Sequence, residues 1–219
     1  MKSSRWKILL LFSIILFPVL FWLLLTRGHN QFRKLPYYGP VEISATGDTI
    51  RHSLSDFHLV NQYGIPVSAD SLRGRIHVAN FFFATCKSIC PQMNTQMARA
   101  AEKLKDDSDV VFVSFTVDPE SDSVQALKAY GEKLHSELFH WWFLTGNKDT
   151  IYTAAREGYL VPAAKGKTAG DFFHSQDLIL VDKDLHIRGI YDGLEPAEVD
   201  TMMDEIKVLR LEYAGHSTH

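Results

Sequence analysis

The amino-acid sequence predicts an α/β sandwich with a mixed central sheet, preceded by one N-terminal transmembrane helix. Two nearly continuous apolar runs, at residues 76–84 and 110–117, are typical of strands that are covered on both faces. Segments with helical spacing follow both runs, and a hairpin pattern and an amphipathic segment close the chain. An uncharged stretch of 18 residues, 8–25, is long enough to span a bilayer as a helix.

The N-terminal stretch is expected to be an uncleaved signal anchor. It lacks the short apolar core and the small-residue cleavage site of a secretory signal peptide, and no cysteine follows it that could carry a lipid. Pro18 is tolerated as a kink, because neighbouring groups can satisfy the freed backbone. Basic residues are similar in number at the two ends, so the charge rule says little about orientation. The very short N-terminal tail favours an N-in orientation, with the rest of the chain outside the cytoplasm.

The remaining sequence is organised as one domain. We predict an anchor over residues 1–27, a tether over 28–48, a domain over 49–213 and a flexible tail over 214–219, because residues 28–48 lack a clean period and contain prolines and glycines. About 170 residues are enough for one well-packed core. The net charge of −3 and the absence of a basic patch argue against a nucleic-acid partner.

The elements of the domain are expected in the following order. Residues 57–68 alternate and turn at Tyr63-Gly64, so they predict a hairpin. The two buried strands follow, with a helix after each; the first of these helices opens with Pro91, which suits a first helical turn. The rest of the chain predicts a short strand at 141–146, a helix at 149–158, a hairpin at 177–193 with its turn at Lys183-Asp184, and a helix at 196–213.

The two cysteines of the chain, Cys86 and Cys90, lie at the predicted junction of the first buried strand and its helix. This placement points to a thioredoxin-like sandwich, and Cys90, beside the predicted helix N-terminus, is where the helix dipole and free N–H groups are expected to stabilise a thiolate. A structural disulfide would close too short a loop to stabilise the fold much. Buried core thiols, thiol–disulfide exchange and binding of a soft metal such as Cu(I) or Zn²⁺ are the other possibilities.

His174 is the histidine best placed to join the cysteines. It lies in "GDFFHSQDLILVD", in a loop that leads into a late strand. In a thioredoxin-like sheet that loop faces the dithiol, and thioredoxin-type reductases place a cis-proline there. This chain has no proline between Pro162 and Pro196. The residues alone leave His174 either as a ligand or as an ordinary loop histidine.

The motif "TCKSICP", followed about 85 residues later by "FHSQDLILVD", resembles the Sco/SenC family of membrane-anchored copper-handling proteins. The stretch "VSFTVDPESDS" and the N-terminal anchor are also similar to that family. The resemblance implies a thioredoxin-like domain that binds copper, as Cu(I) or Cu(II), through Cys86, Cys90 and His174. It implies delivery of copper to the dinuclear copper centre of cytochrome c oxidase, or reduction of the cysteines there. The expected partners are the oxidase copper-site subunit or another copper chaperone, and the expected location is the periplasmic side of the inner membrane.

The chain departs from the family pattern at three places. Lys87-Ser88 stands where a proline commonly follows the first cysteine, Phe173 stands where an Asp commonly precedes the histidine, and Ser121 stands where a basic residue is common. The loss of the carboxylate at 173 removes a possible orienting partner of the imidazole, although it does not remove a ligand.

Two other functions use the same cysteines. A thiol–disulfide oxidoreductase without lasting metal is the main alternative. A peroxiredoxin would need Pro at position 79 and Thr at position 83, where the chain has Ala79 and Phe83. Met93 and Met97 could face a metal but are more often core residues at this spacing. The acidic residues nearby either steer copper or a basic partner, or simply solvate the surface: Asp118, Glu120, Asp122 and Asp171.

Overall fold

The computed structural model describes residues 2–27, 34–161 and 175–216. The chain divides into two compact units, Met1–Arg33 and Lys34–His219. In the first unit, α1 (Lys2–Arg27) is a single helix that contains Pro18. Among the described residues, no helix combines the length and the apolar character that crossing a membrane requires. The transmembrane helix therefore stays a prediction.

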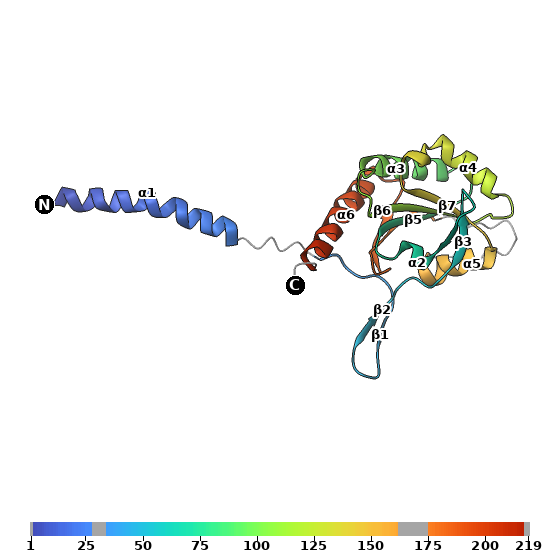
Figure 1. Ribbon diagram of the computed structural model, residues 1–219, viewed down its shortest axis with the longest axis horizontal. Coiled ribbons are helices and arrows are strands. Elements are labelled where there is room, and N and C mark those ends of the chain that lie inside the picture. Colours follow the sequence, from blue (N-terminus) through green and yellow to red (C-terminus); the bar gives the residue numbers. More distant parts are fainter. Residues whose placement is uncertain (1, 28–33, 162–174, 217–219) are drawn as a thin grey trace. The chain divides into compact units, whose positions relative to one another are not determined.

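A seven-stranded sheet forms the centre of the second unit, in the order β4-β3-β7-β6-β5-β8-β9. Figure 1 labels β3, β5, β6 and β7 of this sheet. The three middle strands β5, β6 and β7 run parallel, whereas β3 and β8 pair antiparallel to them on either side. The sheet is therefore mixed, as predicted. The strand bounds are β3 (His58–Asn61), β4 (Pro66–Ser68), β5 (Ile76–Phe82), β6 (Val110–Thr116), β7 (Trp141–Thr145), β8 (Asp177–Val181) and β9 (Ile187–Asp192).

Helices cover both faces of this sheet, which explains why β5 and β6 are fully buried along their length. On one face lie α3 (Cys90–Lys103), α4 (Val124–Lys133) and α6 (Pro196–His216); on the other lie α2 (Ala69–Leu72), α5 (Lys148–Thr153) and the π-helical turn η2 (Ala154–Gly158) (Figure 1). A 3₁₀ turn, η1 (Ser136–Leu138), connects α4 to β7. Because successive residues of a strand point to opposite faces, β5 sends Val78 and Phe82 into one core and Ala79 and Phe81 into the other.

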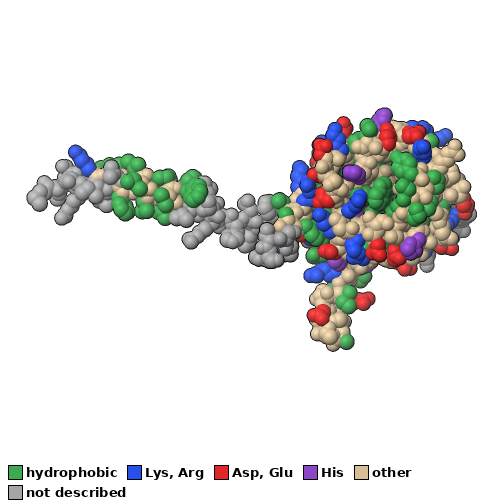
Figure 2. Space-filling model, viewed as in Figure 1, with side chains coloured by type: hydrophobic (Ala, Val, Ile, Leu, Met, Phe, Trp, Pro, Cys, Tyr) green, Lys and Arg blue, Asp and Glu red, His purple; other side chains and the backbone are tan. Residues whose placement is uncertain are grey.

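The compact unit begins at Lys34, ahead of the predicted boundary at residue 49. Leu35 is buried in the core, and its N–H donates to Glu212 Oε1 at 2.9 Å. Farther along, β1 (Val41–Ile43) and β2 (Thr49–Arg51) pair as an exposed hairpin that projects from the domain (Figures 1 and 2). Residues 34–48, the lead-in segment, therefore belong to the domain, although their prolines and glycines leave them without a clean period.

A buried arginine holds this lead-in segment. Arg188, at the start of β9, is 1% exposed and pairs with Asp182 at 3.0 Å and Glu212 at 2.9 Å. Its guanidinium also donates to the carbonyl oxygens of Leu35, at 2.8 Å, and Pro36, at 3.0 Å. One cation thus joins the lead-in segment, the β8–β9 turn and the last helix.

Candidate copper-binding and redox site

The dithiol lies where β5 ends and α3 begins. The backbone N–H of Cys86 donates to Phe83 O at 3.1 Å, which closes a turn directly after the strand. Helix α3 then begins at Cys90, with Pro91 in its first turn. Both cysteines are free thiols and buried, with 8% and 4% of their surface exposed. The prediction of a dithiol at a strand-to-helix junction is confirmed.

The two thiols have different acidities. Burial raises the pKa of Cys86, but hydrogen bonds from the Cys90 thiol and from Ser88 together outweigh burial and bring it below its ordinary value of 9.0. Ser88 Oγ lies 3.5 Å from the Cys86 sulfur. Burial and the hydrogen bond to Cys86 raise the pKa of Cys90 to about 12. Cys86 is therefore the thiol that ionises first, and Cys90 is the proton donor that supports its thiolate. The expectation that the helix N-terminus favours a thiolate at Cys90 is wrong, because burial of that thiol outweighs it.

A chain of buried hydrogen bonds runs beneath α3. The indole of Trp141 can only donate, and its N–H bonds Ser114 Oγ at 2.9 Å. Ser114 therefore donates onward to Asn80 Oδ1 at 2.6 Å, and Asn80 donates to Asn94 Oδ1 at 2.8 Å. Asn94 in turn donates to the hydroxyl of Tyr130 at 2.8 Å. This chain ties the first turns of α3 to all three parallel strands.

Met93 and Met97, on the inner face of α3, are fully buried in the same core cluster as the two cysteines. The surroundings of both thioethers are therefore those of core residues. Gly193 fits closely against Met93, since a Cβ at that glycine would lie 2.8 Å from Met93 Cγ.

The acidic residues after β6 do not share one environment, so it was wrong to group them as surface charges. Glu120 is exposed, and its carboxylate lies 3.4 Å from Lys148 Nζ. Asp122 is 1% exposed, and its Oδ2 accepts hydrogen bonds from the N–H of Ala84 at 3.0 Å and from Thr116 Oγ1 at 2.5 Å. Burial raises the pKa of the Asp122 carboxyl, although these two donors counteract part of that rise. Asp171 lies outside the described residues.

His174 also lies outside the described residues, which resume at Ser175. The topology nevertheless fixes where that part of the chain rejoins the sheet. Strand β8 runs antiparallel to β5, with Ala79 opposite Ile179, so β8 starts at the sheet edge where β5 ends. The carbonyl of Gln176, one residue before β8, accepts the N–H of Gly193 at 2.8 Å. The chain therefore enters β8 at the edge that carries the dithiol.

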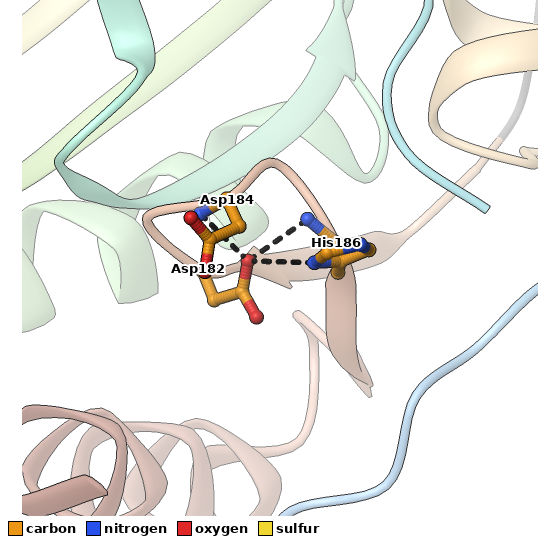
Figure 3. A group of neighbouring side chains, drawn as sticks. All are labelled: Asp182, Asp184 and His186. Atoms are coloured by element: carbon orange, nitrogen blue, oxygen red, sulfur yellow. Dashed lines mark hydrogen bonds and ion pairs between the residues drawn. The ribbon is translucent and has the colours of Figure 1, made fainter. Parts of the chain in front are cut away.

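A second group of possible metal ligands, Asp182, Asp184 and His186, lies in the β8–β9 turn (Figure 3). Asp182 Oδ1 accepts the backbone N–H groups of Asp184 and His186, at 3.0 and 2.9 Å, and its Oδ2 pairs with Arg188. Asp184 accepts the hydroxyl of Tyr213 at 2.8 Å. A bound cation would have to compete with the Arg188 guanidinium, so these contacts fit a closed turn and not a metal site.

A free dithiol at the strand-to-helix junction of a mixed α/β sandwich defines a protein of the thioredoxin-like class. The family model described as SCO1/SenC matches residues 46–209. The SCO1 protein homolog of Bacillus subtilis is 31% identical over 162 residues, which cover 73% of this chain and 84% of that protein. This chain belongs to the SCO1/SenC family.

Solved structures of this family show the same fold. BsSco, described as a member of the Sco family of cytochrome c oxidase assembly proteins with a disulfide switch, superposes with a TM-score of 0.62 at 31% identity, covering 71% of this chain and 92% of that one. ScoI of Arabidopsis thaliana, solved with copper bound, superposes with a TM-score of 0.60 at 29% identity, covering 73% and 99%. The thioredoxin-like fold predicted from the sequence is confirmed.

Proposed function

We propose that this protein is a membrane-anchored copper-binding protein that delivers copper to the copper centre of a cytochrome c oxidase, or maintains the thiols of that centre. The observation that carries the proposal is the free, buried dithiol in which Cys86 is the readily ionised thiol and Cys90 the adjacent donor. Membership of the SCO1/SenC family and the copper-bound ScoI structure support the same role.

The donor set suits copper as cargo. Two thiolates are soft ligands that favour Cu(I), and an imidazole provides a third ligand that Cu(II) also accepts. We propose His174 as that imidazole, because the chain that follows it enters β8 beside the end of β5. Three ligands leave the coordination shell open, so a ligand from a partner can bind before the first ones leave. The negative charge of the thiolates is neutralised by the metal, which in turn favours loss of their protons.

The copper proposal is tested by metal analysis of the full-length protein in detergent, prepared reduced and oxidised. We expect the reduced protein to hold copper and the disulfide form to hold much less. Cys86→Ser, Cys90→Ser and His174→Ala are each expected to lower the affinity, whereas His58→Ala, which changes an 83% exposed side chain, is the matched control. Equal copper content in the reduced and oxidised proteins would remove the thiols from the site.

The acidity difference between the thiols also favours a second activity, reduction of a disulfide in a partner. The Cys86 thiolate would attack a partner disulfide, forming a mixed disulfide and releasing one partner thiolate. Cys90, once it loses its proton, would attack the Cys86 sulfur and release the second thiolate. Two electrons pass to the partner, whose two thiolates take up one proton from Cys90 and one from water, and Cys86 and Cys90 become joined as a disulfide. Stoichiometric reduction of an oxidised copper-site peptide by the reduced, metal-free protein, absent in Cys90→Ser, would support this role.

We propose that the uncharged stretch at residues 8–25, which lies within α1, anchors the protein in the inner membrane with the domain on the periplasmic side. A stretch of this length and composition matches the hydrocarbon thickness of a bilayer. Retention of the protein in the membrane pellet after alkaline extraction is the expected result. Protease added outside spheroplasts should then degrade the domain; protection of the domain would reverse the proposed orientation.

A further inference from the structure

Asp122 lies where the ends of the three parallel strands meet. Its side chain accepts the N–H of Ala84, which follows β5, and the hydroxyl of Thr116, the last residue of β6. Its main-chain carbonyl accepts the hydroxyl of Thr145, the last residue of β7, at 2.9 Å. A carboxylate with 1% of its surface exposed loses most of its hydration, so these protein donors replace the water it has lost.

The hydrogen bond from Ala84 connects Asp122 to the dithiol loop, residues 83–89, which joins β5 to α3. Ala84 is two residues before Cys86, and the Cys86 N–H closes its turn on the carbonyl of Phe83. The peptide that Asp122 holds is thus the one between Phe83 and Ala84, which also supplies the acceptor for that turn. Fixing this peptide fixes the direction in which the turn leaves β5.

The hydroxyl of Thr116 is the donor, and the Asp122 carboxylate the acceptor, in the hydrogen bond between them. Its hydroxyl oxygen accepts the backbone N–H of Asp118 at 3.0 Å, so its single proton is free to point at Asp122. The Asp122 carboxylate therefore accepts one hydrogen bond from Thr116, at the end of β6, and one from the N–H of Ala84. This geometry joins the dithiol loop to the end of the neighbouring strand.

We propose that Asp122 is a positioning residue for the dithiol, which holds the Phe83–Ala84 peptide against the end of β6 and so sets where the Cys86 sulfur lies relative to Cys90. The inference rests on the proposed function, because it concerns the same thiols. It differs from a purely structural role, in which loss of Asp122 would lower stability and leave the chemistry of the thiols unchanged.

Two substitutions separate these roles. Asp122→Ala removes the acceptor for Ala84 and Thr116, whereas Asp122→Asn keeps an oxygen that can accept both donors. Thr145→Val is the matched control, because it removes the hydrogen bond on the other side of the same residue and leaves the Ala84 contact in place. Asp122→Ser, which keeps a polar group too short to reach Ala84, replaces the alanine variant if that variant does not fold.

The experiment measures two properties of the full-length protein in detergent: Cu(I) affinity against a competing chelator, and the equilibrium constant of the dithiol with glutathione. Asp122→Ala is expected to weaken copper binding about 10- to 100-fold, as loss of a ligand-orienting partner commonly does. It should also shift the glutathione equilibrium by about tenfold. Asp122→Asn and Thr145→Val should stay within about threefold of the wild-type protein in both measurements.

A Cu(I) affinity and a glutathione equilibrium constant at wild-type values in Asp122→Ala would overturn the proposal. Equal changes in Asp122→Ala and Asp122→Asn would also overturn it, because they would assign the effect to the lost charge alone. Effects in Thr145→Val as large as those in Asp122→Ala would point to general destabilisation and also overturn it. If the wild-type protein fails to bind Cu(I), the copper proposal fails, whereas the glutathione equilibrium still tests the positioning role of Asp122.

Discussion

At the scale of single residues, the two cysteines differ by their hydrogen-bonding roles. Cys86 accepts from both Cys90 and Ser88, whereas Cys90 is more deeply buried and donates. A thiolate at Cys86 therefore leaves the proton of the pair on Cys90. Because thiolates and not thiols react with alkylating agents, this difference can be measured in the metal-free protein.

We predict that iodoacetamide at pH 8 modifies Cys86 well before Cys90 in the reduced, metal-free protein. The pKa of Cys86 lies below 9.0 and that of Cys90 is about 12, so only Cys86 has an appreciable thiolate fraction at this pH. Peptide mass spectrometry after short reaction times gives the order of labelling. In urea the two rates should become similar; faster labelling of Cys90 in the folded protein would contradict the prediction.

A buried histidine gives the protein a pH-dependent stability. His77, in β5, is fully buried, and its Nε2 lies 3.0 Å from the hydroxyl of Tyr159. Burial lowers the pKa of His77 to about 3, against about 6.5 when unfolded. The unfolded chain therefore binds a proton between these values and the folded chain does not. Stability from this group is complete above pH 6.5 and is lost as the pH falls towards 3.

For His77 we expect about 2 kcal/mol of unfolding free energy to be lost between pH 7 and pH 5. Gln cannot take up a proton, so the unfolding free energy of His77→Gln should fall by about 2 kcal/mol less than that of the wild-type protein over the same interval. Urea unfolding at both pH values provides the measurement, with His58→Gln as the exposed control. Parallel pH dependence in the wild-type protein and His77→Gln would refute the assignment.

At the scale of elements, the hydrogen-bond chain from Trp141 to Tyr130 holds α3 on the sheet. Asn94 is the member of this chain that lies on α3, and its amide accepts from Asn80 and donates to Tyr130. Asn80 and Asn94 are both completely buried, so Asn80 would lose its hydrogen bond without gaining water. The helix that begins with Cys90 is thus kept in register by polar contacts as well as by apolar packing.

Asn94→Ala is predicted to lower the unfolding free energy by about 2 to 4 kcal/mol, because it leaves buried polar groups unpaired. Thr95→Ala, one residue along the same helix and exposed, should cost no more than about 0.5 kcal/mol. Chemical denaturation of both variants measures the difference. Equal losses at the two positions would mean that the chain of hydrogen bonds does not stabilise α3.

The sequence predicted the buried elements more completely than the exposed ones. Continuous apolar runs marked β5 and β6 because both faces of each strand are covered. The β1–β2 hairpin was missed because all of its strand residues are exposed and need no apolar alternation, although Gly47, with φ +85, was a turn signal. The four-residue helix α2 is too short to show a period.

The site was predictable to the extent that it is local in sequence. Cys86 and Cys90 are four residues apart at a junction that periodicity locates. Asp122 was not predictable as a buried group, because its donors come from Ala84, which follows β5, and from Thr116, at the end of β6. Its burial depends on the strand order of the sheet, which composition and spacing do not contain.

At the scale of the whole molecule, Arg188 unites parts of the domain that are far apart in sequence. It is a buried cation with two carboxylate partners and two carbonyl acceptors. Removing one partner from such a cluster leaves uncompensated buried charge, which commonly costs about 3 to 5 kcal/mol.

Arg188→Met is therefore predicted to lower the unfolding free energy by about 3 to 5 kcal/mol, and to expose residues 34–40 to proteolysis. Arg73→Met, which breaks an exposed pair with Asp70, should cost at most about 1 kcal/mol. Denaturation and timed trypsin digestion followed by mass spectrometry measure both effects. A lead-in segment that stays protected in Arg188→Met would show that other contacts hold it.

The position of Arg188 has a mechanical consequence. Strand β9 runs in the same direction as β5, so its first residues lie at the far end of the sheet from the sulfurs, roughly 20 Å away for seven residues of strand. Tension that arrives along the backbone ahead of Leu35 is taken up at that remote end, by β9 and the final helix. A pull on the chain at Leu35 therefore does not pass through the turn that carries Cys86 and Cys90.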